Sequence, residues 1–160
     1  MYMDNKVRKL TMLNGSIYRC TQQYMEKELK KLNLSIGTYP FLLTLNRNEG
    51  VCQNKISNEL NVDKAMATRN VRKLIELGYI RKDQNTEDAR AYKLYVTSKG
   101  KQVIPEVIEI IQKWIEILVQ GTSEEKIGES IEFLQRVLKN GKKYKDECVE
   151  RMNSFERDRK

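Results

Sequence analysis

The sequence contains no histidine. It also lacks a glycine-rich phosphate loop, a serine nucleophile elbow and the ligand spacings of zinc sites. Its acidic side chains lie beside lysines in helical patterns, where ion pairing and solubility account for them. These absences argue against catalysis, since histidine is the side chain most often used for proton transfer near neutral pH. We therefore expect a protein that is not an enzyme and that holds no metal ion or other cofactor.

Cysteine is scarce as well, with three residues at widely separated positions, Cys20, Cys52 and Cys148. An odd number without regular spacing argues against a disulfide framework. Free thiols are typical of a reducing cytosol. The first ten residues, MYMDNKVRKL, are too polar for a signal peptide. The sequence thus predicts a cytoplasmic location.

No hydrophobic run is long enough to cross a membrane. A spanning helix needs about 20 apolar residues, and the most apolar stretch, residues 103–119, is interrupted by charged side chains. We therefore expect no membrane partner. With 160 residues, 39% of them hydrophobic, the chain is long enough for one domain with a core and appended helices. The interrupting charges are Glu106, Glu109, Lys113 and Glu116.

Positive charge, by contrast, is in excess. The chain has 30 lysines and arginines against 22 acids, a formal net charge of +8 and a pI near 9.3. Residues 64–82 contain six basic side chains and the single acid Glu76. A clustered basic excess favours an anionic partner, and nucleic acid before a membrane surface or an acidic protein. The six are Lys64, Arg69, Arg72, Lys73, Arg81 and Lys82.

This basic stretch lies within a pattern typical of a winged helix-turn-helix. A helical pattern over 53–60 is joined to a second by a tight connection, in which Asn61 suits a left-handed turn and Asp63 a helix N-cap. Gly78 ends the second helix, and two strand-like runs surround the polar loop QNTEDARA. Helical periodicity turns the basic side chains outward and places the apolar ones inward. The expected inward residues are Ala67, Val71, Leu74 and Ile75.

Longer helical patterns precede and follow this part. An amphipathic helix runs from about Leu10. A second starts at Ser98 and crosses Pro105, which should kink or restart it. A third is capped by Thr122, and its pattern fades after Gly141. These helices suit either a dimer in which two chains interleave or a monomeric helical cap. We predict the homodimer, because paired half-sites give such modules affinity and register.

The predicted fold is therefore mainly α with a small β-hairpin wing. The winged helix-turn-helix DNA-binding domain is expected to span residues 35–97, with Ser35 capping its first helix. An N-terminal dimerisation helix at 1–34 and C-terminal dimerisation helices at 98–150 should flank it, and 151–160 should form a charged tail.

A recognition helix reads DNA with side chains of its N-terminal half laid along base edges in the major groove. Arg69 and Arg72 are expected to donate in bidentate fashion to guanine. Ala65 and Thr68 are expected to contact a thymine methyl group. Lysine more often binds phosphate, and we assign that role to Lys64 and Lys73.

Two charged residues of the wing carry further predictions. Arg90, on a polar loop, suits a narrow minor groove, whose negative potential attracts arginine. Asp88 would repel phosphate. Its two candidate roles are to orient an arginine, either Arg90 or one of the recognition helix, and to take part in an ordinary turn.

The run NELNVDKAMATRNVRKLIELGYIRK, followed by NTEDARAYKLYVTSKG, resembles the MarR family of bacterial transcription regulators, and LSIGTYPFLLTL is similar to that family's second helix. The resemblance covers roughly residues 10–150. Its most specific parts are Thr68 with Arg69, the helix end at 74–78, and in the wing Asp88, Arg90 and residues 97–100. It implies a homodimeric repressor or activator on a pseudopalindromic operator. Ala89 departs from the paired wing arginines frequent in the family.

The resemblance also implies regulation by a small aromatic ligand or by thiol oxidation. Tyr18, Tyr39 and Trp114 are the candidates to line a ligand cleft, although such residues more often belong to a core or an interface. Cys52 is the candidate thiol, since a helix N-terminus favours the thiolate. Cys20 lies on the apolar stripe and is expected to be structural.

Another interpretation keeps the winged helix but changes its partner. Such a fold also serves protein contacts, architectural nucleic-acid binding and structured RNA. RNA readers present aromatic side chains for stacking on exposed bases, whereas the outward positions here are Lys, Ala, Thr and Arg. Double-stranded DNA is therefore the predicted partner.

Overall fold

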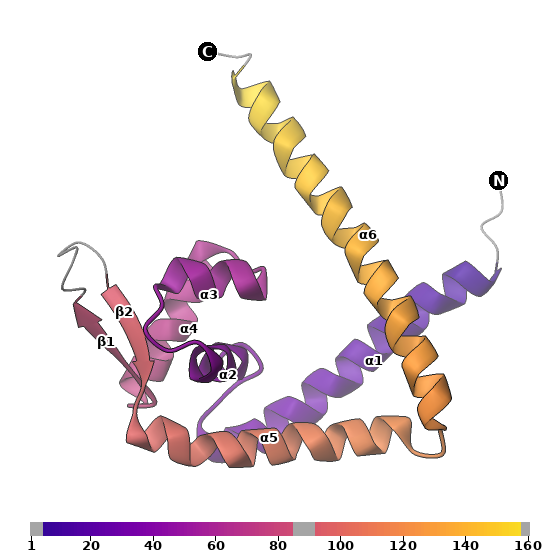
Figure 1. Cartoon of the computed structure of the whole chain (residues 1–160). Helices are drawn as coiled ribbons and strands as arrows, with labels where there is room; N and C mark the ends of the chain where they lie inside the picture. Colours follow the sequence, from indigo (N-terminus) through magenta and orange to yellow (C-terminus); the bar gives the residue numbers. More distant parts are fainter. Residues whose placement is uncertain (1–4, 85–91, 158–160) are drawn as a thin grey trace. The chain divides into compact units, whose positions relative to one another are not determined.

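The computed structural model describes residues 5–84 and 92–157, the side chains at 145–146 and 149–157 excepted. Asp88 and Arg90 lie outside the described residues. The chain divides into two compact units, Met1–Glu116 and Ile117–Lys160. Within the described residues the fold is helical except for one antiparallel hairpin, so the predicted class, mainly α with a β-hairpin wing, is confirmed (Figure 1).

The elements follow one another in the predicted order. They are α1 (Asn5–Leu29), the 3-10 turn η1 (Lys30–Leu32), α2 (Tyr39–Arg47), α3 (Gln53–Leu60), α4 (Lys64–Glu76), β1 (Ile80–Gln84), β2 (Tyr92–Val96), α5 (Ser98–Val119) and α6 (Glu124–Arg157). No described helix is both long enough and apolar enough to span a bilayer.

One hydrophobic core joins the elements of the first unit. Its centre is made by the apolar faces of α2, α3 and α4, and the hairpin, the end of α1 and the start of α5 close around them. Leu42, Leu74 and Val107 are fully buried. Burying such a side chain stabilises the fold by about 1.5 to 3 kcal/mol, so this core fixes the orientation of α4. The other core residues on these three helices are Phe41, Leu45, Ile56, Ala67 and Val71.

The connection between α3 and α4 is a tight helix-turn-helix. Asn61 adopts the predicted left-handed conformation at φ 54°. Val62 then donates its N–H to the carbonyl of Ser57 at 3.0 Å. Asp63 caps α4 as predicted, since its Oδ1 accepts the N–H of Met66 at 2.7 Å. An N-cap of this kind contributes about 1 kcal/mol and sets the residue at which α4 begins.

The hairpin is anchored to the helices at its base. In its register Ile80 faces Val96, and Gln84 faces Tyr92. The segment before α3 adds a short third edge, because Leu94 exchanges backbone hydrogen bonds with Gly50 and Val51, at 2.9 and 3.0 Å. The stem of the wing is thereby held beside α4.

Helix starts differ from the predicted ones at three places. The cap of α2 is Thr38 rather than Ser35, because Ser35 and Thr38 close a turn through their own hydrogen bonds. Thr97 caps α5, its Oγ1 accepting the N–H of Gly100 at 3.0 Å. Ser123 caps α6, accepting from Lys126 at 3.4 Å.

The longer helices differ from the predicted ones in two ways. α5 continues through Pro105, so the restart predicted there as one of two outcomes does not occur, and the kink stays a prediction. α6 does not fade after Gly141, and its helical backbone runs on to Arg157. Pro105 is the eighth residue of α5, so the helix continues there with one backbone donor missing. The lysines and glutamates after Gly141 are good helix formers, which accounts for the length of α6.

Candidate nucleic-acid interface

α4 presents a mainly polar face to solvent, next to which Met66 is 39% exposed. Ala67, Val71 and Leu74, spaced four and three residues apart, are buried. This spacing turns the neighbouring positions outward, as predicted. The exposed set comprises Lys64, Ala65, Thr68, Arg69, Arg72 and Lys73. Ile75 was predicted to point inward but is 37% exposed, because it lies at the edge of α4 that faces the hairpin.

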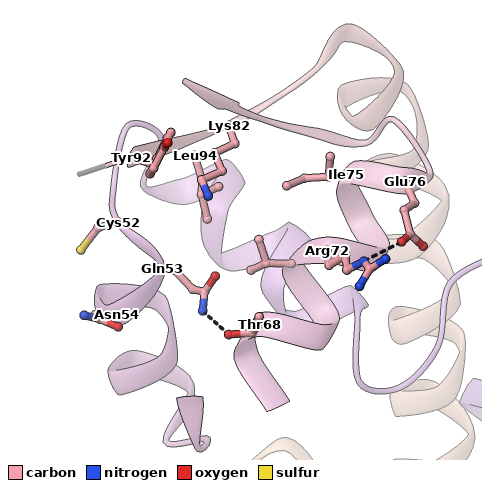
Figure 2. A pocket seen from close by; sticks show the side chains of 11 residues that line it. Cys52, Gln53, Asn54, Thr68, Arg72, Ile75, Glu76, Lys82, Tyr92 and Leu94 are labelled. Atoms are coloured by element: carbon pink, nitrogen blue, oxygen red, sulfur yellow. Dashed lines mark hydrogen bonds and ion pairs between the residues drawn. The ribbon is translucent and has the colours of Figure 1, made fainter. Parts of the chain in front are cut away.

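Thr68 is held in place by a residue of α3. Gln53 Nε2 donates to Thr68 Oγ1 at 2.9 Å, and Thr68 Oγ1 donates in turn to the carbonyl of Lys64 at 2.8 Å. Figure 2 shows the Gln53 side chain reaching across from α3 to α4. Our reading of the sequence assigned no role to Gln53. The sequence feature that could have indicated this role is that Gln53 is a polar residue at the first position of α3.

Arg72 lies within an ion pair on the surface of α4. Its Nε donates to Glu76 Oε1 at 3.0 Å, and the two side chains are 80% and 51% exposed. An exposed pair at this helical spacing contributes only about 0.3 to 0.5 kcal/mol. The terminal nitrogens of the guanidinium remain available, so the pair orients Arg72 without preventing contact with a nucleic acid.

The stem of the wing adds positive charge beside α4. Arg81 pairs with Asp83, and its Cζ lies 4.7 Å from the centre of the Tyr95 ring. Lys82 Nζ lies 3.8 Å above the Tyr92 ring. These contacts hold long cationic side chains against the hairpin, and a cation over an exposed ring gains about 0.5 to 1 kcal/mol. Sequence reasoning counted Arg81 and Lys82 in the basic cluster but gave them no role.

A cleft of about 820 Å³ separates α3 and α4 from the hairpin (Figure 2). Cys52 lines one end, at the predicted N-cap position of α3, where it is exposed and its side chain makes no capping hydrogen bond. Tyr92 lines the cleft as well and is 43% exposed. The rest of the lining is partly apolar and partly polar. The apolar residues are Val71, Ile75 and Leu94, and the polar ones are Gln53, Asn54, Thr68, Arg72, Glu76 and Lys82.

The MarR family matches residues 34–92, which run from the end of η1 through α2, α3 and α4 to the start of β2. The HTH-type transcriptional regulator BilQ of Clostridioides difficile (strain CD3) is 38% identical to the chain over 114 residues. These cover 71% of this chain and 77% of that relative. The chain belongs to the MarR family. Family and relative are transcriptional regulators, not enzymes.

Solved structures of MarR-family proteins share the fold. A MarR protein from Peptoclostridium difficile is 30% identical to this chain, and the two structures align with a TM-score of 0.79. The alignment covers 88% of this chain and 92% of that one. A Listeria monocytogenes protein, described as a MarR family transcriptional regulator, was solved in complex with a 26mer DNA. It is 28% identical, with a TM-score of 0.75 over 86% of this chain and 89% of its own.

The three residues predicted to line a ligand cleft are placed on three helices. Trp114 of α5 packs on α1, where its Nε1 donates to Thr21 Oγ1 at 2.9 Å and its ring stacks on Tyr24 at 4.7 Å. Tyr18 lies one turn before Thr21 and is 59% exposed. Tyr39 begins α2 and packs on the core, and burial raises its pKa. None of the three lines the cleft beside α4.

Metal binding finds no support among the residues that the structure describes, which contain no group of His, Cys, Asp or Glu able to hold an ion. Cys20 is exposed on α1 rather than buried in a core. The expectation that Cys20 belongs to the core is therefore wrong within this unit.

Proposed function

We propose that this MarR-family regulator is a transcriptional repressor that binds a pseudopalindromic DNA operator as a homodimer. The observation that carries the proposal is the exposed face of α4. This face is polar and basic, lies directly after a capped helix-turn-helix, and has the cationic stem of the wing beside it. That is the form in which a recognition helix enters the major groove.

The proposed roles follow the chemistry of each exposed side chain. Arg69 and Arg72 donate to guanine O6 and N7, the bidentate contact that suits a planar guanidinium. Lys64, at the first turn of α4, and Lys73 bind phosphates. Ala65 and Thr68 present methyl groups to thymine. In the wing, Arg90 enters the minor groove. Asp88 keeps the two roles that the sequence offers, which are to orient an arginine or to take part in a turn.

Exposed apolar stripes on the outer helices support the homodimer. On α1, Val7, Leu10, Leu13 and Ile17 are each between 38% and 51% exposed. On α6, Ile131, Leu134 and Leu138 are between 50% and 58% exposed, at helical spacing. Rows of this size are rarely left in water and are typical of surfaces that meet another chain. The two recognition helices of a dimer would then meet half-sites about one helical turn, or a multiple of it, apart.

Three further predictions come from the sequence. They are an aromatic effector bound at Tyr18, Tyr39 and Trp114, a redox role for Cys52, and a cytoplasmic location. A calorimetric screen with phenolic acids tests the effector. Peroxide treatment tests the thiol, because operator binding that is unchanged after proven oxidation of Cys52 would exclude the redox role.

The experiment that tests the proposal is selection of bound duplexes from a random library at one near-physiological salt concentration, with the protein's mass in solution measured alongside. An inverted repeat bound by a dimer is the expected result. Recovery of no consensus, with binding that disappears as salt rises, would mean that α4 makes phosphate contacts alone. The architectural or protein-interaction role would then replace the operator-binding one.

Two substitutions on α4 distinguish recognition of a base from binding of phosphate groups. Arg69→Ala should remove the preference for guanine at one position, a loss of about 1 to 3 kcal/mol of discrimination. Lys73→Ala should weaken binding to all duplexes and reduce the slope of log affinity against log salt by about one unit. Affinities measured on the selected site and on scrambled DNA at several salt concentrations check both. Equal, sequence-independent losses in the two variants would refute the assignment.

A further inference from the structure

The hydroxyl group of Thr68 has little hydrogen-bonding freedom left. A threonine hydroxyl has one hydrogen to donate and two lone pairs to accept with. The hydrogen goes to the carbonyl of Lys64 at 2.8 Å, and one lone pair accepts from Gln53 Nε2 at 2.9 Å. Thr68 itself is exposed on the outward face of α4. One lone pair therefore remains, and it belongs to a side chain that faces solvent.

The bond from Gln53 also fixes where that lone pair lies. Gln53 is the first residue of α3, 15 positions before Thr68, so the contact ties the two helices of the helix-turn-helix together. Gln53 is half-buried, and its side chain extends along the protein surface toward α4 (Figure 2). A hydroxyl held from two sides does not rotate to suit whatever group approaches it. It offers an acceptor and no donor.

We propose that Gln53 is a positioning residue for DNA recognition, which holds Thr68 as an acceptor-only reader of the exocyclic amino group of adenine or cytosine. The inference rests on the proposed function, because it assumes that α4 enters the major groove. In that groove adenine N6 and cytosine N4 are donors, whereas guanine N7 and O6 and thymine O4 are acceptors. A hydroxyl whose hydrogen is already used binds the first two and is repelled by the others.

This inference differs from the simpler expectation for a threonine on a recognition helix. A free hydroxyl both donates and accepts, so it contacts any base and discriminates little. Removing the donor turns a permissive contact into a selective one. The γ-methyl group is not used by either hydrogen bond, so contact with a neighbouring thymine methyl remains compatible with the amino-group contact.

The test measures the affinity for the selected operator and for its single-base variants, at one salt concentration, for the wild-type protein, four single variants and the double variant that combines Thr68→Val with Gln53→Met. Thr68→Val removes the hydroxyl and keeps the shape. Thr68→Ser keeps the hydroxyl and removes the methyl group. Gln53→Met keeps the length of the side chain but cannot donate. Asn54→Ala is the matched control, since Asn54 neighbours Gln53, is exposed and makes no contact with Thr68 in Figure 2.

We expect the wild-type protein to prefer adenine or cytosine over guanine or thymine at one position in each half-site by about fivefold, the value of one hydrogen bond. Thr68→Val and Gln53→Met should lose that preference at the same position, and the double variant should lose no more than either alone. Thr68→Ser and Asn54→Ala should keep it. Unfolding temperatures show that each variant is folded.

The possible failures are distinguishable. A wild-type protein with no base preference at any position would overturn the proposed operator reading and this inference with it. A wild-type protein that selects a site, combined with a Gln53→Met variant of unaltered base preferences, would overturn only the role of Gln53. A change caused by Gln53→Met at a position that Thr68→Val leaves untouched would likewise exclude the coupling of the two residues.

Discussion

Gly100 is required where the first turn of α5 meets the base of the hairpin, at Tyr79 just before β1 and Val96 at the end of β2. A Cβ atom at this position would lie 2.1 Å from the carbonyl oxygen of Tyr79 and 2.7 Å from Val96 Cγ1. Gly100→Ala should therefore lower the free energy of unfolding by about 1 to 3 kcal/mol, the cost of overpacking a core. Gly128→Ala on α6 is the control, because a Cβ there meets nothing within 4 Å. It should stabilise its helix by up to about 1 kcal/mol. Urea unfolding of both variants checks this, and equal stabilities would contradict it.

Residues with local roles could be predicted from the sequence, and residues whose roles depend on another element could not. The left-handed turn at Asn61, the cap at Asp63 and the stop at Gly78 each depend on backbone within a few positions. The hydrogen bond from Gln53 to Thr68 joins residues 15 positions apart, so no local sequence pattern predicts it. The exposure of Ile75 depends likewise on how the hairpin packs beside α4.

At the scale of elements, Tyr79 couples the end of α4 to η1 and predicts a loss of stability at high pH. Its Oη donates to the carbonyl of Leu32 at 2.8 Å, and burial, followed by the charge of Glu106, raises the pKa of Tyr79 above its usual 10.0. The folded protein therefore favours the neutral phenol. Its contribution is fully present below about pH 10 and falls as the pH rises through the higher folded-state pKa.

Unfolding free energies measured between pH 8 and 11 check this prediction. Tyr79→Phe should cost about 1 kcal/mol at pH 8, the net value of one hydrogen bond, and should flatten the decline above pH 10. Tyr92→Phe, at an exposed position of the hairpin, is the control and should retain the wild-type slope. A Tyr79→Phe protein that declines as steeply as the wild type would show that other groups cause the loss.

The extent of each element was harder to predict than its existence. Hydrophobic periodicity marks the faces of α4 and α5 that the core buries, and it marks one face of α6 that is exposed in this chain. The starts of α5 and α6 depend on which of several neighbouring hydroxyl groups reaches a free N–H, and Thr97 and Ser123 took the place of Ser98 and Thr122. The start of α2 moved from Ser35 to Thr38, whose side chain makes no capping hydrogen bond. The end of α6 was missed because a mainly polar sequence can still be a good helix former.

At the scale of the whole molecule, the sequence predicted the class of fold and the side of α4 that faces outward. The core explains both, since each helix of the first unit has one clearly apolar face. The surface that covers the exposed apolar stripes of α1 and α6 could not be predicted in the same way. Leu13 and Ile17 are each 50% exposed. A pattern along the sequence marks these residues as apolar, but it does not show which surface covers them.

We predict that the protein has twice the chain mass of 18.9 kDa in solution and that the α1 stripe maintains this state. Leu13→Lys combined with Ile17→Lys places two charges in a surface that should be apolar and adds repulsion between chains of net charge +8. The dissociation constant of the dimer should rise by about tenfold or more. Affinity for the operator should fall with it, because a monomer contacts one half-site.

Met12→Lys is the matched control for this variant. Met12 is 64% exposed on the same helix, but at 3.6 residues per turn it lies on another face than Leu13 and Ile17. It adds charge and removes apolar surface without entering the stripe. Analytical ultracentrifugation over a range of concentrations should find the Met12→Lys protein dimeric and the double variant shifted toward the monomer. If both dissociated alike, the loss would reflect net charge alone, and if neither did, the stripe on α1 would not be part of the interface.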